Sequence, residues 1–191
     1  YRTIPADAAL ISSHQNLAQR WPQLATNIWL DPLLGAAKTS DRTPGHNTFL
    51  SVAQLIRLAR HDTLLAYLPA PGGTGKHAWM AAAWIGGWSP VVRWDLYWGQ
   101  WSGIKEVGAF GGRTMWGVQN PLADGRRLSF ACGDGVLMAC LSSDPAAIRY
   151  VLMAYDGLIP STRALAELRT MPEPVYPDVV WGQWQDSTNT E

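Results

Sequence analysis

The segment HAWMAAAWIGGWSPVVRWDLYWGQW, from His77 to Trp101, holds six of the eleven tryptophans in this chain of 191 residues. They are Trp79, Trp84, Trp88, Trp94, Trp98 and Trp101. An indole ring is large and apolar and carries one N–H group, so each ring must either pack in a core or face a ligand or partner. This density of rings restricts the fold more than any other stretch of the chain.

The second half of this segment predicts a helix. Ser89 can cap its N-terminus, Pro90 suits a first turn because its missing N–H is not needed there, and Gly99 marks its end. The helix would place four large apolar side chains on one face, namely Val91, Trp94, Trp98 and Trp101. That face must either cover the sheet or contact another molecule.

The first half, residues 78–85, follows the glycine-rich turn 69–76 and predicts a strand. Its alanines and its methionine would also suit a helix. Because apolar residues occupy both faces of this strand, Trp79 and Trp84 are expected in the core.

The rest of the chain predicts further strands and helices in alternation. Strands are expected at residues 8–13, 63–68, 113–118, 128–132 and 136–141. Helices are expected from Asn16 onward and at residues 47–60, 145–156 and 161–169. Antiparallel hairpins with helices inserted between them predict an α+β fold, a mainly antiparallel sheet with helices packed on one face.

The length and the 47% hydrophobic content suit one domain with a real core. We expect this single α+β domain to span residues 1–178, with a flexible segment near 31–46 that is rich in proline, glycine and polar residues. Residues 179–191 form an aromatic segment and a polar tail, which suggests a cut point in a longer protein. The chain starts at Tyr1 without a methionine, as a processed chain or a trimmed piece would.

Charge and hydropathy exclude two classes of partner. Fifteen basic and fifteen acidic residues give a net charge of zero, so no nucleic-acid partner is expected. No apolar run reaches the roughly 18 residues that cross a bilayer, so a membrane would be reached only through a segment outside this chain. Cys132 and Cys140 flank the turn at 133–135 and are expected to be free, buried thiols, because their strand positions are too far apart to bridge.

No motif predicts a cofactor, a metal or catalytic residues. The loop Pro71–His77 is similar to a phosphate-binding loop, but Ala70 occupies the first glycine position and His77 the hydroxyl position. The four histidines are scattered, and the nucleophile motif G-x-S-x-G is absent. An enzyme whose site lacks a recognisable motif is therefore only the third hypothesis.

Two short motifs carry a resemblance. Residues 128–156 combine a strand, a Cys-Gly-Asp-Gly-Val-Leu turn, a second strand and a Ser-Ser-Asp-Pro helix start, and Ile4-Pro5-Ala6-Asp7-Ala8 precedes the first strand. This pattern is similar to that of bacterial exported or membrane-tethered α+β domains of unknown function. The resemblance implies an exocytoplasmic setting, exported or membrane-attached, with a cytoplasmic location as the alternative. It supplies no catalytic residues, and the tryptophan run departs from the pattern.

The sequence Trp-Gly-Gln-Trp occurs twice, at residues 98–101 and 181–184. Such rings can serve as exposed aromatic platforms, so five residues are candidate binding residues: Trp94, Trp98, Trp101, Trp181 and Trp184. The first hypothesis is a non-catalytic domain that acts through a protein partner or self-association. The alternative is a carbohydrate-binding module that uses the same rings, and the competing structural explanation is core packing.

Overall fold

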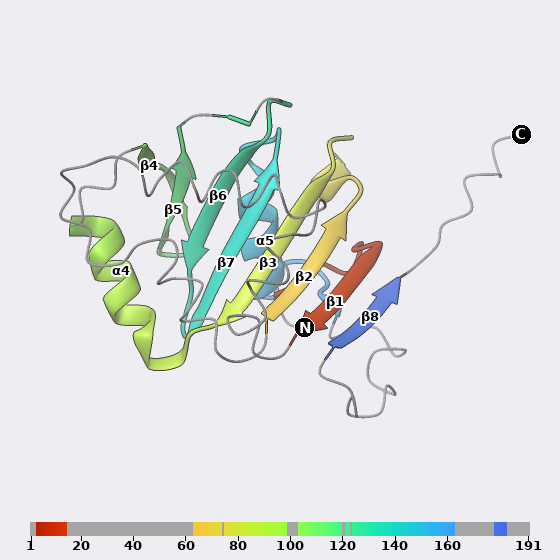
Figure 1. Cartoon of the computed structure of the whole chain (residues 1–191), viewed down its shortest axis with the longest axis horizontal. Helices are drawn as coiled ribbons and strands as arrows, with labels where there is room; N and C mark the ends of the chain where they lie inside the picture. The colour runs from red at the N-terminus through yellow and green to blue at the C-terminus, as the bar shows by residue number, and fades with distance from the viewer. Residues whose placement is uncertain are drawn as a thin grey trace, which may run out of the picture.

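The computed structural model describes residues 3–14, 63–73, 75–98, 103–119, 121–122 and 124–162, together with the backbone of 178–182 (Figure 1). The strands are β1 (Leu10–His14), β2 (Thr63–Leu68), β3 (Ala78–Trp84), β4 (Ile104–Phe110), β5 (Arg113–Val118), β6 (Arg127–Cys132), β7 (Val136–Ser142) and β8 (Asp178–Gly182). The helices are α4 (Ser89–Trp98) and α5 (Ala147–Tyr155), with short 3-10 turns η1 (Pro71–Gly73) and η2 (Gly86–Trp88). The strands form one antiparallel sheet in the order β4-β5-β6-β7-β3-β2-β1-β8. The predicted α+β class with a mainly antiparallel sheet is confirmed.

The strand predicted over 78–85 is confirmed as β3, which lies between β2 and β7 in the middle of the sheet. Small side chains suit this central position. Ala78, Met80 and Ala82 point to one face and are buried, and they leave room for a helix to pack closely above them. The alternation of burial along β3 has the period of two that a helix could not give.

Helix α5 packs on that face of the sheet. Asp144 stabilises the turn that leads into it, because its side chain accepts a hydrogen bond from the Ala146 N–H at 2.9 Å. Gly157 ends it with φ 76°, and its N–H reaches the Ala154 carbonyl at 3.1 Å, as predicted for a glycine after a helix. The main core lies between helix and sheet and includes Ile11, Ala66, Leu68, Met80, Met138, Ile148, Val151 and Leu152.

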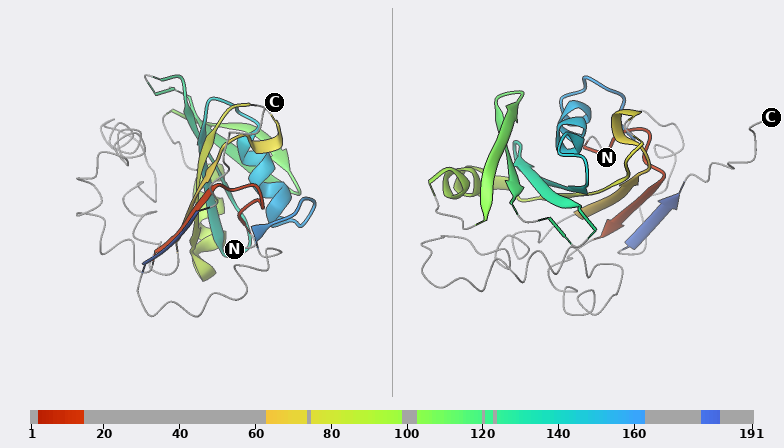
Figure 2. Two further views of the ribbon diagram at one scale, coloured as in Figure 1. Left: turned by 90° about the vertical axis from the view of Figure 1, so that its right-hand side faces the viewer. Right: turned by 90° about the horizontal axis from the view of Figure 1, so that it is seen from above.

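Helix α4 packs on the opposite face, which corrects the expectation that the helices share one face. Strand β6 shows the reason: Ala131 belongs to the core under α5, whereas its neighbours Phe130 and Cys132 belong to a second core under α4. Three successive apolar side chains cannot all point to one side of a strand, so β6 needs cover on both faces. In the second view of Figure 2, the curved sheet passes between α4 and α5.

The sequence predicts the β6–β7 hairpin, but it does not predict the β4 strand of the β4–β5 hairpin. The β6–β7 hairpin is confirmed, with Cys132 opposite Leu137 and the turn at 134–135. Its two cysteines, Cys132 and Cys140, are free and buried, as predicted. Strand β4 was not predicted: it is an edge strand, largely exposed, with a bulge between Glu106 and Gly108.

The C-terminal aromatic segment contributes a strand to the sheet, since β8 pairs with β1 along residues 178–182. The helices predicted from Asn16 and at 47–60, and the segment 31–46, lie outside the described residues, as does nearly all of the helix predicted at 161–169. Within the part of the chain that is described, no helix is long and apolar enough to span a bilayer.

Candidate functional site

Helix α4 turns its tryptophans away from the sheet. Its inward residues are Ser89, Val92, Asp95 and Leu96, which are all buried. Val92 and Leu96 pack against Ile85 and Phe130 in the second core. The face that carries Trp94 and Trp98 is therefore the outer one, and these two side chains are 53% and 68% exposed.

The exposed side of η2 and α4 carries five large apolar residues, which we call the aromatic surface: Trp88, Val91, Trp94, Tyr97 and Trp98. Trp88 is 52% and Tyr97 65% exposed. Taking about 200 Å² for a whole aromatic side chain, the four rings together expose on the order of 500 Å². This lies near the upper end for the largest apolar patch of a monomeric protein, about 300 to 600 Å², and patches of this size are often functional.

The β6–β7 turn holds the start of α4 in place. The Ser89 hydroxyl donates a hydrogen bond to the Gly133 carbonyl at 2.6 Å, and it lies 3.3 Å from the Cys132 sulfur. Ser89 has helical dihedral angles, φ −53° and ψ −44°, so its side chain ties the helix to the sheet and is not the expected N-terminal cap. Burial is the main reason that the pKa of the Cys132 thiol is raised, which keeps this thiol protonated and unreactive at neutral pH.

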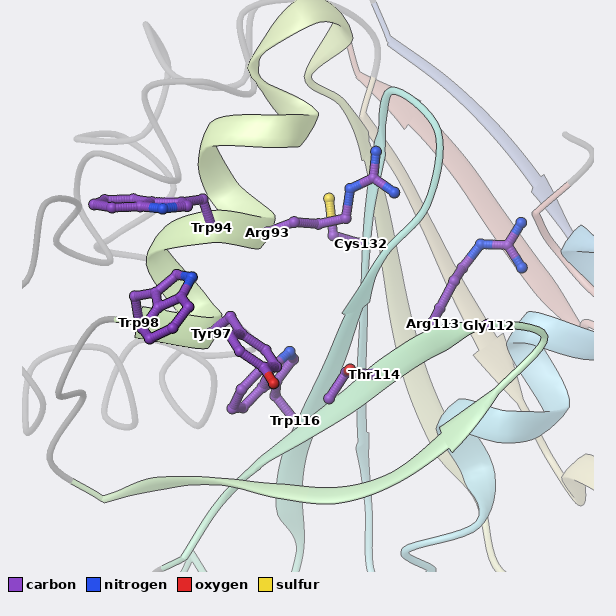
Figure 3. A pocket seen from close by; sticks show the side chains of 9 residues that line it. All are labelled: Arg93, Trp94, Tyr97, Trp98, Gly112, Arg113, Thr114, Trp116 and Cys132. Atoms are coloured by element: carbon purple, nitrogen blue, oxygen red, sulfur yellow. The ribbon is translucent and has the colours of Figure 1, made fainter.

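A cavity of about 310 Å³ lies between α4 and the β4–β5 hairpin (Figure 3). It is lined by Arg93, Trp94, Tyr97, Trp98, Gly112, Arg113, Thr114, Trp116 and Cys132. In Figure 3, Trp94 and Trp98 extend outward from α4, whereas Thr114 and Trp116 belong to the strand on the other side of the cavity. The cavity is therefore built from a helix, a strand and, at its back, the end of β6.

The hairpin wall is fixed to α5 by an ion pair. Arg113 donates to both carboxylate oxygens of Asp156, at 2.8 and 3.0 Å, and its guanidinium lies 5.0 Å from the centre of the Tyr155 ring. Both hydrogen bonds come from one nitrogen, Nη1, and such charge-assisted hydrogen bonds are stronger than those between neutral groups. Arg113 therefore lines the cavity with the aliphatic part of its side chain, while its guanidinium binds Asp156 on the α5 side of the sheet.

The structure separates the two Trp-Gly-Gln-Trp copies. Trp98 ends α4, which packs beside β6, whereas Trp181 lies in β8 at the far edge of the sheet (Figure 1). Trp101 and Trp184 lie outside the described residues, and so does the side chain of Trp181. Of the five candidate residues, only Trp94 and Trp98 are shown together, one helical turn apart.

The rings next to the aromatic surface differ from expectation in their burial. Trp84 was expected in the core, but half of it is exposed, because it is the last residue of β3 and its ring lies beside Gly135 of the β6–β7 turn. Trp79 is half-buried, with its ring 5.0 Å from that of Tyr67. Tyr97 was missed as a surface residue, although its position three residues after Trp94 could have indicated it.

The described residues contain no group of three or more His, Cys, Asp or Glu side chains that could hold a metal ion. Comparisons of the chain with known protein families, characterised proteins and solved structures gave no match. The resemblance of residues 128–156 to bacterial exported domains therefore stays a prediction.

Proposed function

We propose that this chain is a non-catalytic domain that acts through protein–protein contacts or self-assembly, and that the aromatic surface makes those contacts. The observation that supports this is the exposure of Trp94 and Trp98 on the outer side of a helix whose inner side is already packed. A helix that only covered the sheet would place its largest rings inward.

The size and composition of the aromatic surface fit a protein partner. Its rings expose on the order of 500 Å², well over half of the roughly 800 Å² that each partner contributes to a standard interface. Tryptophan and tyrosine are also enriched among the residues that dominate binding energy. Arg93 is the only charged residue on the outer side of α4, so a partner would remove little charge from water there.

The test compares the wild-type chain with the double variant Trp94→Ala/Trp98→Ala. Sedimentation velocity over a range of concentrations measures self-association, and immobilised protein measures capture of a partner, which mass spectrometry then identifies. The proposal expects association in the wild type and its loss in the double variant. The matched control is Leu158→Ala, an exposed apolar residue beyond the end of α5, which should leave association unchanged. Equal association of both variants and the wild type would contradict the proposal.

A carbohydrate ligand is the alternative, and one observation favours it. The rings of Tyr97 and Trp98 are 5.4 Å apart at 72°, so they form an exposed corner in which one ring can stack on a sugar while the other borders its edge. Titration with a panel of neutral glycans, followed by tryptophan fluorescence, tests it. No change with any sugar would remove the alternative.

We also propose an exported or membrane-attached, exocytoplasmic location, on the strength of the sequence resemblance alone. The full-length reading frame tests this, because a signal peptide or anchor upstream of Tyr1 is expected. A complete reading frame with neither would overturn it.

A further inference from the structure

The cavity between α4 and β5 has a lining with a definite chemistry. Four of its nine residues are aromatic, namely Trp94, Tyr97, Trp98 and Trp116. Two are arginines, and none is an Asp or Glu. Its volume of about 310 Å³ lies at the lower end of small-molecule sites, which suits a ligand of about one ring.

The polar groups around this cavity are mainly hydrogen-bond donors. Guanidinium and indole groups only donate, while the hydroxyls of Thr114 and Tyr97 can do either. A ligand rich in acceptor oxygens could therefore form hydrogen bonds there, whereas a ligand with donors alone could not. The aromatic walls require that the rest of the ligand offers a flat or ring-shaped apolar face.

Of the two arginines among the described residues that line the cavity, Arg93 is the one whose charge can serve a ligand. Arg113 is occupied by its contact with both oxygens of Asp156. Arg93, in contrast, forms an ion pair with Asp134 at 3.8 Å, and the two side chains are 49% and 78% exposed. Such an exposed ion pair contributes little, so a ligand carboxylate can compete with Asp134 for the guanidinium.

We propose that this cavity binds a small carboxylate carried on a six-membered ring, with the ring between Tyr97 and Trp116 and the carboxylate on Arg93. The ring can be aromatic or a pyranose, because both offer an apolar face. The cavity shares Trp94, Tyr97 and Trp98 with the aromatic surface, but the proposal is tested at Arg93 and Asp134, which lie outside that surface. Its failure can therefore be told apart from the failure of the proposed protein contacts.

The binding test uses the intact chain and five probes, measured by calorimetry and by ligand-observed NMR. Benzoate and glucuronate each carry a ring and a carboxylate. Benzamide and glucose carry the ring alone, and acetate carries the carboxylate alone. Binding of benzoate, glucuronate or both, tighter than that of the neutral ring and of acetate, supports the proposal and identifies the type of ring. Equal binding of acid and neutral ring, equal binding of acetate, or no binding at all overturns it.

Two substitutions move the affinity in opposite directions. Arg93→Gln removes the cation and should abolish the preference for the acid over the neutral ring. Asp134→Asn removes the competing carboxylate and should tighten acid binding about two- to fivefold, which corresponds to the worth of an exposed ion pair. Asn-Gly is itself a favoured pair in a tight hairpin turn, so the fold should be kept.

The matched control is Arg127→Gln, an exposed arginine at the start of β6, away from Cys132 at the other end of that strand. Its acid affinity should equal that of the wild type. If Arg127→Gln weakens binding as much as Arg93→Gln does, the ligand responds to overall charge and the assigned site is wrong. An unchanged or weakened affinity in Asp134→Asn would also contradict the role given to Arg93.

Discussion

The ion pair between Arg113 and Asp156 offers the sharpest test of how the hairpin wall is held. Arg113→Gln removes the cation while keeping a side chain that can donate a hydrogen bond. It leaves the Asp156 carboxylate without its partner at the end of α5. Asp156→Asn removes the opposite charge from the same contact.

The expected cost follows from burial and geometry. The Arg113 and Asp156 side chains are 17% and 21% exposed, between a surface pair and a buried one. Exposed pairs contribute up to about 1 kcal/mol, whereas breaking a buried pair costs about 3 to 5 kcal/mol. We therefore expect Arg113→Gln to lower the free energy of unfolding by about 2 kcal/mol, which is about 4 to 8 °C in melting temperature for a chain of this length.

The assay is a double-mutant cycle in which urea unfolding is measured for both single variants and for the double variant. A coupling energy of about 1 to 2 kcal/mol is expected between the two positions. The control is the pair Arg126 and Asp124, two residues apart and more exposed, whose coupling should be about 0.5 kcal/mol or less. A coupling energy for Arg113 and Asp156 no larger than that of the control would refute the reasoning.

Three further substitutions have defined outcomes in urea unfolding. Burial raises the pKa of the Cys140 thiol to about 12 from 9.0, so above pH 9 only the unfolded chain releases this proton. The free energy of unfolding should fall by about 1.4 kcal/mol per pH unit from about pH 9 to 12, and Cys140→Ala should lose that part of the slope. Ser89→Ala removes the 2.6 Å hydrogen bond to the Gly133 carbonyl and should cost about 1 to 2 kcal/mol. Gly135→Ala should cost about 2 kcal/mol, because φ is 78° there and the new Cβ would lie 2.9 Å from the Trp84 ring. A loss below about 0.5 kcal/mol in Ser89→Ala or Gly135→Ala would contradict the contact described for that residue.

The hairpin and helix between residues 128 and 156 could be predicted because their signals are local. Asp134-Gly135 specifies a tight turn, Asp144 stabilises the turn that leads into a helix, and Gly157 ends that helix, each within a few residues of the structure that it determines. Strand β4 lacked such signals. The charges at Lys105 and Glu106 and the glycine at its bulge interrupt the alternation of apolar and polar residues that indicates a strand.

The sequence predicts which residues of the candidate site share a helical face, but not the direction of that face or the cavity beside it. Helical spacing correctly placed Trp94 and Trp98 on one face of α4, but it could not say which face points inward. The choice depends on Val92 and Leu96, which are small enough to pack over Phe130, and on the Ser89 hydroxyl at the β6–β7 turn. Those contacts join residues more than thirty positions apart, and the cavity brings α4 together with β5, which follows β4 in the chain. No local pattern could reveal either.

The most direct test of the aromatic surface is hydroxyl-radical footprinting of individual tryptophans, in the free chain and in whatever assembly it forms. The account predicts that oxidation of Trp88, Trp94 and Trp98 falls at least severalfold on association. Half-buried Trp79, on a strand in the middle of the sheet, should show no change. An assembly in which Trp94 and Trp98 are oxidised as fast as in the free chain would contradict the central claim, and so would a chain that stays monomeric and captures no partner.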